Sequence, residues 1–178
     1  ISGRILRSGM AYAEKRVVKS IPQIYAAKKN LGRPVISIEF FPPKTPQGEK
    51  SLYERVLPRL AGVRPDFCSV TYGAGGSTRD KTLVVVDRIQ QDYGLVGMAH
   101  LTCLSTSTAA ILDYVTDAQA RGIRNILALR GDPPADEPNF VPPDNGFDYA
   151  YQLIEFIKRH GSTDMSIGCA GFPEGHIA

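Results

Sequence analysis

Apolar segments of strand length alternate with segments of helix length from residue 35 onward, and this alternation predicts an α/β fold of the (β/α)8 TIM-barrel class. Successive strands begin about 28 to 42 residues apart, the size of a strand plus a crossover helix. The strands are apolar on both faces, as in Ile126-Leu127-Ala128-Leu129, which is typical of buried parallel strands. A doubly wound dinucleotide-binding sheet is disfavoured. Such a sheet has a glycine-rich fingerprint after its first strand, whereas the residues here are Pro42-Pro43-Lys44-Thr45.

The first element expected is a short helix over residues 20–31. Ser20 and Gln23 have the spacing of a capping box, and Pro22 lies early in the first turn, where its missing N–H costs least. Gly32 then ends the helix. This helix precedes the first strand of the barrel.

The later elements follow from apolar runs, caps and terminal glycines. The expected strands span 35–41, 66–72, 96–103, 123–130 and 165–172. The expected helices span 47–61, 79–93, 107–121 and 147–160, and they end at Gly62, Gly94, Gly122 and Gly161. Ser105 or Thr106 is expected to cap the third of these helices. Together with the N-terminal helix, they amount to about five βα units of a barrel.

Positive charge is concentrated at the N-terminus. Residues 1–34 contain eight Lys or Arg and one acid, Glu14, so the remainder carries a net charge of −4 within a chain of net charge +3. We interpret residues 1–19 as a flexible basic leader and residues 20–178 as the N-terminal portion of the barrel domain. Basic residues interleaved with aromatic ones are missing, so a nucleic-acid partner is not expected.

Three cysteines, Cys68, Cys103 and Cys169, lie far apart in the sequence. Their odd number and spacing disfavour a disulfide framework or a zinc finger, and we expect reduced thiols that pack in the core of a cytoplasmic protein. The longest apolar runs, such as residues 83–86, are too short to cross a bilayer. No metal site or membrane partner is expected.

Polar residues gather where the predicted strands end. In a barrel these ends form the catalytic face. The residues at these ends are Glu39, Thr71, Tyr72, His100, Thr102, Arg130, Asp132, Glu174 and His176. Each has a structural alternative: Glu39 could pair with a cation inside the barrel, His100 could be a core histidine, and Arg130 with Asp132 could form a local ion pair.

Two of these residue types suit particular chemistry. Apolar neighbours around Glu39 would favour its protonated form, as a general acid requires. The guanidinium of Arg130 offers a planar fork for a phosphate or a carbonyl-rich heterocycle. Glycines within 73–77 allow close backbone approach to an anion. These glycines alone would also permit an alternative function, that of another barrel enzyme that binds a phosphorylated substrate.

The motifs at these strand ends closely resemble those of the methylenetetrahydrofolate reductase family. They occur in family order and cover residues 35–176 almost continuously. They are Ile38-Glu39-Phe40-Phe41-Pro42-Pro43-Lys44-Thr45, Val70-Thr71-Tyr72-Gly73-Ala74-Gly75-Gly76-Ser77-Thr78-Arg79-Asp80, His100-Leu101-Thr102-Cys103, Asn125-Ile126-Leu127-Ala128-Leu129-Arg130-Gly131-Asp132-Pro133-Pro134 and Ala170-Gly171-Phe172-Pro173-Glu174-Gly175-His176.

This resemblance implies a flavoprotein that uses FAD to pass a hydride from NADH or NADPH to 5,10-methylenetetrahydrofolate. The product would be 5-methyltetrahydrofolate, which feeds methionine synthesis. Glu39 matches the family's general acid, and Asp132 matches an aspartate near the flavin and the folate. The positions that match cofactor-lining residues are Thr71, Tyr72, Ala74, His100, Arg130, Gly131, Asp132, Tyr149, Ala170, Phe172 and His176. Phe172 stands where many family members have tyrosine.

One departure concerns the length of the barrel. The family fold has eight strands, whereas this sequence predicts five, so we expect an N-terminal fragment of a reductase. For the full-length enzyme we expect a homo-oligomer. The alternative function is a non-catalytic flavin-binding fragment, because strands six to eight are missing. Such a fragment would hold flavin, or dock on a partner through its open sheet edges, without turnover.

Overall fold

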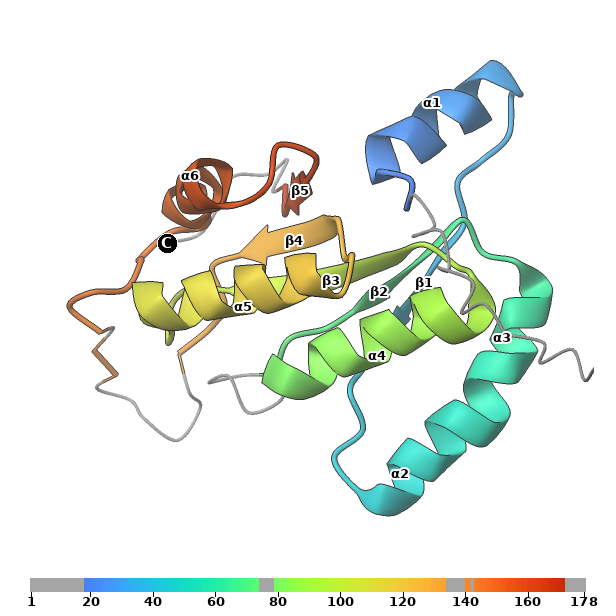
Figure 1. Ribbon diagram of the computed structural model, residues 1–178, viewed down its shortest axis with the longest axis horizontal. Coiled ribbons are helices and arrows are strands. Elements are labelled where there is room, and N and C mark those ends of the chain that lie inside the picture. The colour runs from blue at the N-terminus through green and yellow to red at the C-terminus, as the bar shows by residue number, and fades with distance from the viewer. Residues whose placement is uncertain (1–17, 74–78, 134–139, 142, 172–178) are drawn as a thin grey trace, which may run out of the picture.

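The computed structural model describes residues 18–73, 79–133, 140–141 and 143–171. Within these ranges, five parallel strands form one sheet in which each strand pairs with the next along the chain (Figure 1). The strands are β1 (Ser37–Phe40), β2 (Phe67–Val70), β3 (Gly97–Thr102), β4 (Asn125–Leu129) and β5 (Ser166–Cys169). This sequential order confirms the α/β class and matches the first units of a TIM barrel.

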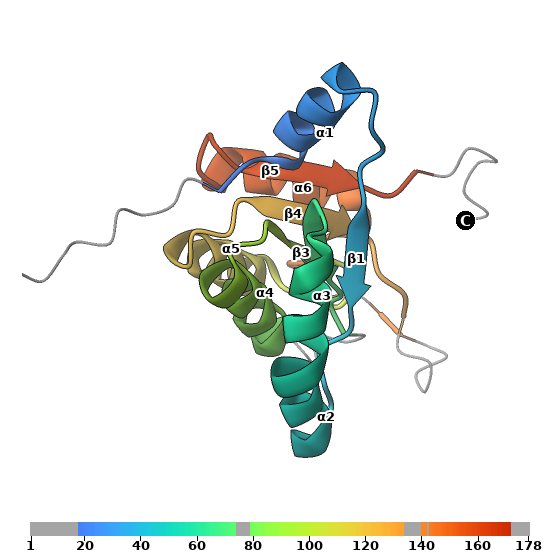
Figure 2. The same cartoon turned by 90° about the vertical axis from the view of Figure 1, so that its right-hand side faces the viewer.

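The helices after β1 connect consecutive strands, and α4 and α5 lie side by side on one face of the sheet (Figures 1 and 2). The helices are α1 (Ile21–Asn30), α2 (Pro46–Ser51), η1 (Leu52–Val56), α3 (Leu57–Val63), α4 (Arg79–Tyr93), α5 (Thr108–Ala120) and α6 (Ala150–His160). No helix in the described ranges combines the length and apolar character that a membrane crossing requires.

The helix after β1 departs from the predicted boundary. Segments α2, η1 and α3 form a continuous helix to Val63, so Gly62 lies inside it and does not end it. Arg64, with φ 54°, takes the left-handed position beyond the helix. The turn at η1 is wider than an α-helical turn, since the N–H of Leu57 donates to the carbonyl of Leu52. Pro58 explains this widening, because its ring would clash with the carbonyl four residues earlier in a regular helix.

Two other helix starts differ from expectation. Ser107, and neither Ser105 nor Thr106, caps α5, because its Oγ accepts from the N–H of Ala110 at 3.3 Å. Helix α6 begins at Ala150 and not at residue 147. The side chain of Gln152 reaches back and its Oε1 accepts from the N–H groups of residues 148 and 149, which satisfies the donors at that end.

Apolar side chains on the helix-facing side of the sheet form the main core. Alternate residues of each strand point there, and most are buried. The sheet residues of this core are Phe40, Cys68, Val70, Ala99, Leu101, Ile126 and Ala128. Leu83, Val86 and Ile89 of α4 and Ile111 and Val115 of α5 cover them. The opposite, inner face of the strands is therefore the face available for chemistry.

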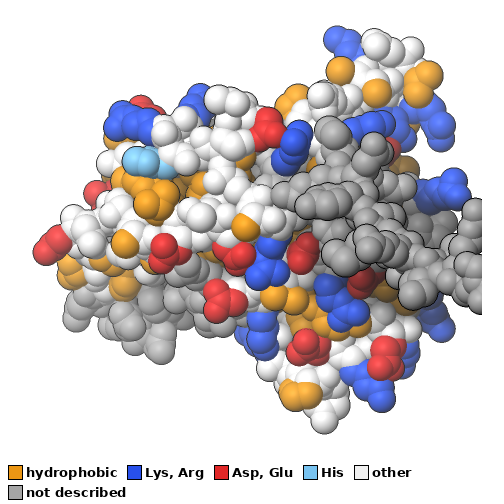
Figure 3. Space-filling view, viewed as in Figure 1, with side chains coloured by type: hydrophobic (Ala, Val, Ile, Leu, Met, Phe, Trp, Pro, Cys, Tyr) orange, Lys and Arg blue, Asp and Glu red, His pale blue; other side chains and the backbone are white. Residues whose placement is uncertain are grey.

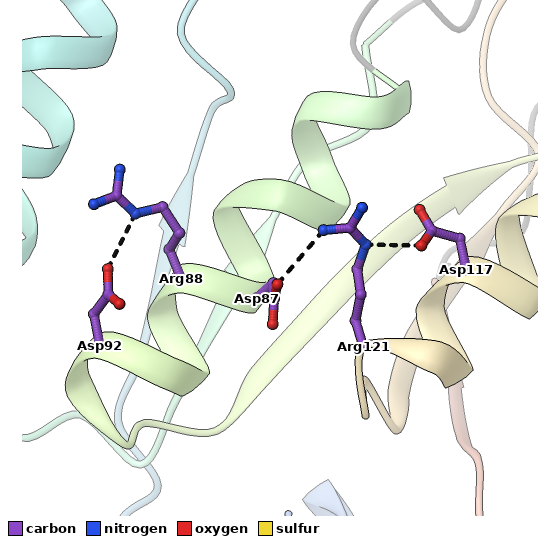
Figure 4. A network of polar contacts seen from close by, with 5 residues as sticks. All are labelled: Asp87, Arg88, Asp92, Asp117 and Arg121. Carbon is purple, nitrogen blue, oxygen red and sulfur yellow. Dashed lines mark hydrogen bonds and ion pairs between the residues drawn. The ribbon is translucent and has the colours of Figure 1, made fainter.

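A polar network ties α4 to the end of α5 (Figure 4). Arg121 follows α5, and its Nε lies 2.9 Å from Oδ1 of Asp117, while its Nη1 lies 3.5 Å from Oδ2 of Asp87 on α4. Arg88 and Asp92 form a separate pair within α4, 3.0 Å apart. Ion pairs that are partly open to solvent contribute little individually, so apolar packing carries most of the helix–sheet stability.

Helix α1 lies beyond the ends at which the strands begin (Figure 1). Its Ile24 packs on Phe67 of β2 and Met98 of β3, forming a small second core on the inner face. The fully buried amide of Asn125 joins this helix to the sheet. Its Oδ1 accepts from the N–H of Ile21 at 2.9 Å, and its Nδ2 donates to the carbonyls of residues 19 and 97, each at 3.2 Å. The predicted N-terminal helix is therefore confirmed as a part of the fold.

An ion pair fixes the same helix at its other end. Nζ of Lys28 lies 2.8 Å from Oδ1 of Asp66, and Oδ2 of Asp66 accepts from the N–H of Ile36 at 2.8 Å. Burial alone would raise the pKa of Asp66, but the hydrogen bonds from Lys28 and Ile36 outweigh it and lower that pKa below its usual value. Lys29 and Arg33, two other cations of this region, are exposed. The space-filling view shows Lys and Arg side chains, in blue, at this end of the molecule (Figure 3).

The cysteines are free thiols in two different settings. Cys68 and Cys103 are buried, as expected, and burial raises the pKa of each thiol to about 11. Cys169 is exposed, so the prediction that it packs in the core is wrong. It ends β5, the edge strand of the described sheet, where no following strand covers it.

The amide of Asn125 provides a test of how α1 is held. We expect Asn125→Ala to lower the free energy of unfolding by about 2 kcal/mol, because one change leaves several buried backbone groups without partners. Urea unfolding monitored by circular dichroism measures this loss. Asn30→Ala, at the exposed end of α1, is the matched control, and an equal effect of the two changes would contradict this role.

The Lys28–Asp66 pair predicts a pH-dependent contribution to stability. Because the pKa of Asp66 is lowered in the folded state, its contribution is fully present above the unfolded value of about 4 and is lost as the pH falls through the lower folded value. Unfolding of the wild type and Asp66→Asn at a series of pH values should show the largest difference near pH 6 and a shrinking one below pH 4. A difference that grows in acid would have the wrong sign.

Candidate active site

The carboxyl ends of the strands bring most of the predicted site residues to one edge of the sheet. Glu39 lies in β1, Thr71 follows β2, His100 lies in β3, Arg130 to Asp132 follow β4, and Ala170 follows β5. Parallel pairing of neighbouring strands places these ends together. Ala74, Phe172, Glu174 and His176 were also predicted for the site, and they lie outside the described residues.

The best-defined contact joins three side chains of the inner face. Glu39 and Ser69 are in register on β1 and β2, and Oγ of Ser69 lies 3.4 Å from Oε2 of Glu39. Nε2 of His100, on β3, lies 3.5 Å from the same Oε2. The carboxyl group therefore has a hydroxyl on one side and an imidazole on the other.

His100 is buried, with 7% of its side chain exposed, and its Nε2 has no hydrogen-bond partner within the described residues. Burial lowers its pKa, and the nearby charge of Glu39 opposes that effect without reversing it. The imidazole is therefore neutral at pH 7. The hydroxyl of Tyr114 donates to the carbonyl of His100 at 2.9 Å, which fixes this part of β3 from the core side.

The setting of Glu39 differs from the one predicted. Its side chain is 49% exposed, whereas its sequence neighbours were expected to shield it. Ile38 and Phe40 point to the helix-facing side of the sheet, since side chains alternate along a strand, and Phe41 is exposed. The apolar environment expected for this carboxyl is not present among the described residues.

The segment after β4 is held in a defined conformation. Nε of Arg130 donates to the carbonyl of Asp148 at 3.0 Å, which orients the guanidinium along the loop before α6. Gly131 has φ +81°, and a Cβ there would come within 2.9 Å of Cβ of Thr102. Both features require glycine. Asp132 follows directly and is exposed.

The two aromatic residues predicted to line a cofactor occupy different environments. Tyr72 is only 9% exposed and packs edge-on against Tyr114, with ring centroids 5.6 Å apart, so its ring is part of the core. Tyr149, just before α6, is 55% exposed and stacks on Tyr151 with centroids 5.9 Å apart. Tyr149 therefore offers an aromatic surface, and Tyr72 offers only its backbone.

The backbone of Thr71 is hydrogen-bonded to the neighbouring strand and to a helix. Its N–H donates to the carbonyl of Phe40, and its carbonyl accepts from Oγ1 of Thr82, each at 2.9 Å. The end of β2 is thereby tied to both β1 and α4.

Ser69 is the site residue that sequence reasoning did not identify. It lies within a predicted strand and two residues before Thr71, so the alternation of side chains placed it on the same face as the strand-end residues. That spacing, combined with the pairing of adjacent strands, is the signal that would have found it. Its 7% exposure confirms that this hydroxyl is enclosed.

These residues fit a flavin in chemical terms. Arg130 supplies hydrogen-bond donors, and Tyr149 supplies an exposed ring. A ligand rich in carbonyl and phosphate oxygens, with a flat ring system, would match this donor set.

Comparison with known proteins shows which family the chain belongs to. The family model for methylenetetrahydrofolate reductase matches residues 24–178. The chain belongs to the methylenetetrahydrofolate reductase family. It is 42% identical over 159 residues to "Probable methylenetetrahydrofolate reductase (NADH)" of Oryza sativa subsp. japonica, which covers 89% of this chain and 26% of the rice protein.

Relatives from other kingdoms give the same family. "Methylenetetrahydrofolate reductase 1" of Schizosaccharomyces pombe is 43% identical over 140 residues, covering 79% of this chain and 23% of that protein. "5,10-methylenetetrahydrofolate reductase" of Pectobacterium carotovorum subsp. carotovorum is 39% identical over 145 residues, covering 82% of this chain and 46% of that protein. The chain thus spans less than half the length of these members of the methylenetetrahydrofolate reductase family.

Gly131 provides a test of how closely the segment after β4 packs against Thr102. We expect Gly131→Ala to lower the free energy of unfolding by about 1–3 kcal/mol, because the new Cβ meets Thr102 and the positive φ disfavours an L side chain. Gly62→Ala is the control, since it lies within a helix with nothing within 4 Å of the added Cβ. Thermal unfolding of both variants measures the effect, and equal stabilities would contradict the close packing.

Proposed function

We propose that this chain is part of the catalytic barrel of an enzyme that reduces 5,10-methylenetetrahydrofolate to 5-methyltetrahydrofolate. FAD is the proposed flavin, and NADH or NADPH the hydride donor. The observation that supports this most strongly is the carboxyl of Glu39, half exposed on the inner face and contacted by Ser69 and His100, in a chain of this family. The name of the rice relative specifies NADH, which makes NADH the first donor to test.

Glu39 has the proposed role of general acid. Opening the five-membered ring of the folate requires a proton on the leaving nitrogen, and a carboxylic acid at the catalytic face of the barrel is suited to donate it. Its partial exposure allows the group to recover a proton from solvent after each turnover. The neutral imidazole of His100 leaves this carboxyl without a permanent cationic partner.

The strand-end residues have the proposed role of holding the flavin, which supplies the hydride-transfer chemistry when bound. Arg130 and Gly131 would bind its polar groups, Tyr149 would pack on a ring, and Tyr72 would contribute through its backbone. Asp132, exposed beyond β4, would favour the cationic form of the substrate and oppose negative charge on the flavin. The proposed lining also includes Thr71, Ala74, His100, Ala170, Phe172 and His176.

The proposed context of this activity is the cytoplasm, with the product feeding methionine synthesis. Residues 20–178 are the proposed N-terminal portion of the barrel domain, preceded by the basic leader 1–19, of which only Val18 and Lys19 lie in the described ranges. A folate is the proposed small-molecule partner, and neither nucleic acid nor membrane is required for the reaction.

Glu39→Gln in the full-length protein tests the central role. We expect flavin reduction by NADH to be retained and the oxidation of reduced flavin by 5,10-methylenetetrahydrofolate to fall by about 10²–10⁴-fold, because the amide cannot donate a carboxylic proton. Stopped-flow absorbance of the flavin follows both half-reactions separately. Glu49→Gln, an exposed glutamate of α2, is the matched control.

The outcomes separate the alternatives. Unchanged folate reduction in Glu39→Gln would remove Glu39 from the role of acid. A wild-type protein that binds flavin but never passes hydride to the folate would support a flavin-binding protein without turnover. A protein without flavin absorbance would contradict both.

A further inference from the structure

A hydroxyl group and an imidazole nitrogen approach the same oxygen of Glu39. Oγ of Ser69 donates to Oε2 at 3.4 Å, and Nε2 of His100 lies 3.5 Å from that oxygen. The two groups come from different strands and are both about 93% buried. Ser69 has no part in the function proposed above, and His100 has one only as a flavin contact.

The positions of these donors distinguish the two oxygens of a carboxylic acid. An oxygen that accepts hydrogen bonds from two enclosed donors is favoured as the carbonyl oxygen, and the acid proton then belongs on the other oxygen. When the proton leaves, the same donors stabilise the negative charge that remains. Ser69 and His100 would therefore act in both states of the acid.

His100 fits this role only in one tautomer. Its burial keeps the imidazole neutral, so only one ring nitrogen carries a hydrogen. An enclosed Nε2 without any partner would be costly, whereas an Nε2–H needs only a small rotation to donate to Oε2 at 3.5 Å. The bond from Tyr114 to the carbonyl of His100 holds the strand in place for this contact.

We propose that Ser69 and the Nε2–H tautomer of His100 are positioning residues that hold Oε2 of Glu39 as an acceptor, so that the acid donates its proton from Oε1. This inference rests on the proposed function. The O–H bond at Oε1 breaks as an N–H bond forms on the folate nitrogen, and the carboxylate keeps the electron pair and the negative charge. Solvent later returns one proton to the half-exposed carboxyl.

The groups that face Glu39 determine which changes of charge could affect the pH profile of the folate step. On β3 the titratable group that faces it is His100, and on β2 the facing group is the Ser69 hydroxyl. On its own strand, the neighbour on the same face is the uncharged Ser37. Removal of the Ser69 donor should therefore act on the acid and leave the surrounding charges unchanged.

A series of Ser69 variants in the full-length protein tests the proposal kinetically. We expect Ser69→Ala to slow oxidation of reduced flavin by 5,10-methylenetetrahydrofolate about tenfold or more, from loss of a hydrogen bond to a charged group, with NADH-driven flavin reduction unchanged. The midpoint of the pH profile of the folate step should move to higher pH, since the anion has lost a donor. Ser69→Thr, which keeps a hydroxyl, should restore both, and Ser69→Cys, close in size but a weak donor, should not.

The results that would overturn the proposal are equally specific. An unchanged folate step in Ser69→Ala, an equal loss in both half-reactions, or a slowed step with an unmoved pH profile would each assign Ser69 a merely structural role. Restoration by Ser69→Cys as well as by Ser69→Thr would assign the effect to volume.

A second measurement does not depend on activity. Nitrogen-15 spectra of the imidazole groups of the labelled full-length protein at pH 7 should show protonated Nε2 and unprotonated Nδ1 for His100, whose signals are assigned by their loss in His100→Gln. A protonated Nδ1 with bare Nε2, or an imidazolium, would overturn the proposal. If the wild type fails to reduce the folate, the proposed function fails, and these spectra still decide whether His100 donates to Glu39.

Discussion

The alternation of side chains across a parallel sheet is the constraint on which both the core and the candidate site depend. Phe40 and Val70 pair in register and point toward the helices, so Glu39 and Ser69, one residue earlier, must share the inner face. A slip of one residue in this pairing would bury the carboxyl among aliphatic side chains and expose the core. The apolar packing of α4 and α5 on the sheet therefore also sets the position of Glu39.

The inner face changes character along the strands. Where the strands begin, Phe67, Met98 and Ile24 of α1 pack together, and Asn125 satisfies the backbone groups at the start of that helix. Toward the strand ends, Glu39, His100 and the residues after β4 are polar, and several are open to solvent. The inner face is thus apolar where the strands begin and polar where they end, as is typical of this fold.

The sequence predicted the order of elements and the strand-end residues because both depend on local patterns: apolar runs, caps and terminal glycines. It failed at two helix boundaries and at one site residue. The widened turn before Pro58 moved the end of a helix past Gly62, and the side chain of Gln152 set the start of α6. Ser69 was not predicted as a site residue, because a serine within an apolar strand has no local signal of function.

The same distinction explains the environment of Glu39. Its sequence neighbours are apolar, but a strand sends them to the opposite face, so the groups that matter come from β2 and β3. Sequence adjacency overstated the shielding of this carboxyl, and only the pairing of strands identifies its actual neighbours. Tyr72 is the converse case, because its position at a strand end suggested a ligand contact while its ring packs on Tyr114 in the core.

The burial of His100 has a consequence for the acid beside it. A cationic imidazole 3.5 Å from the carboxyl would favour the carboxylate and oppose its use as a proton donor. Burial lowers the pKa of His100 and keeps the ring neutral at pH 7, so it can donate a hydrogen bond without fixing a charge on its neighbour. Tyr114 holds the backbone of this residue from within the core, which links the packing beneath the sheet to the position of the imidazole at the candidate site.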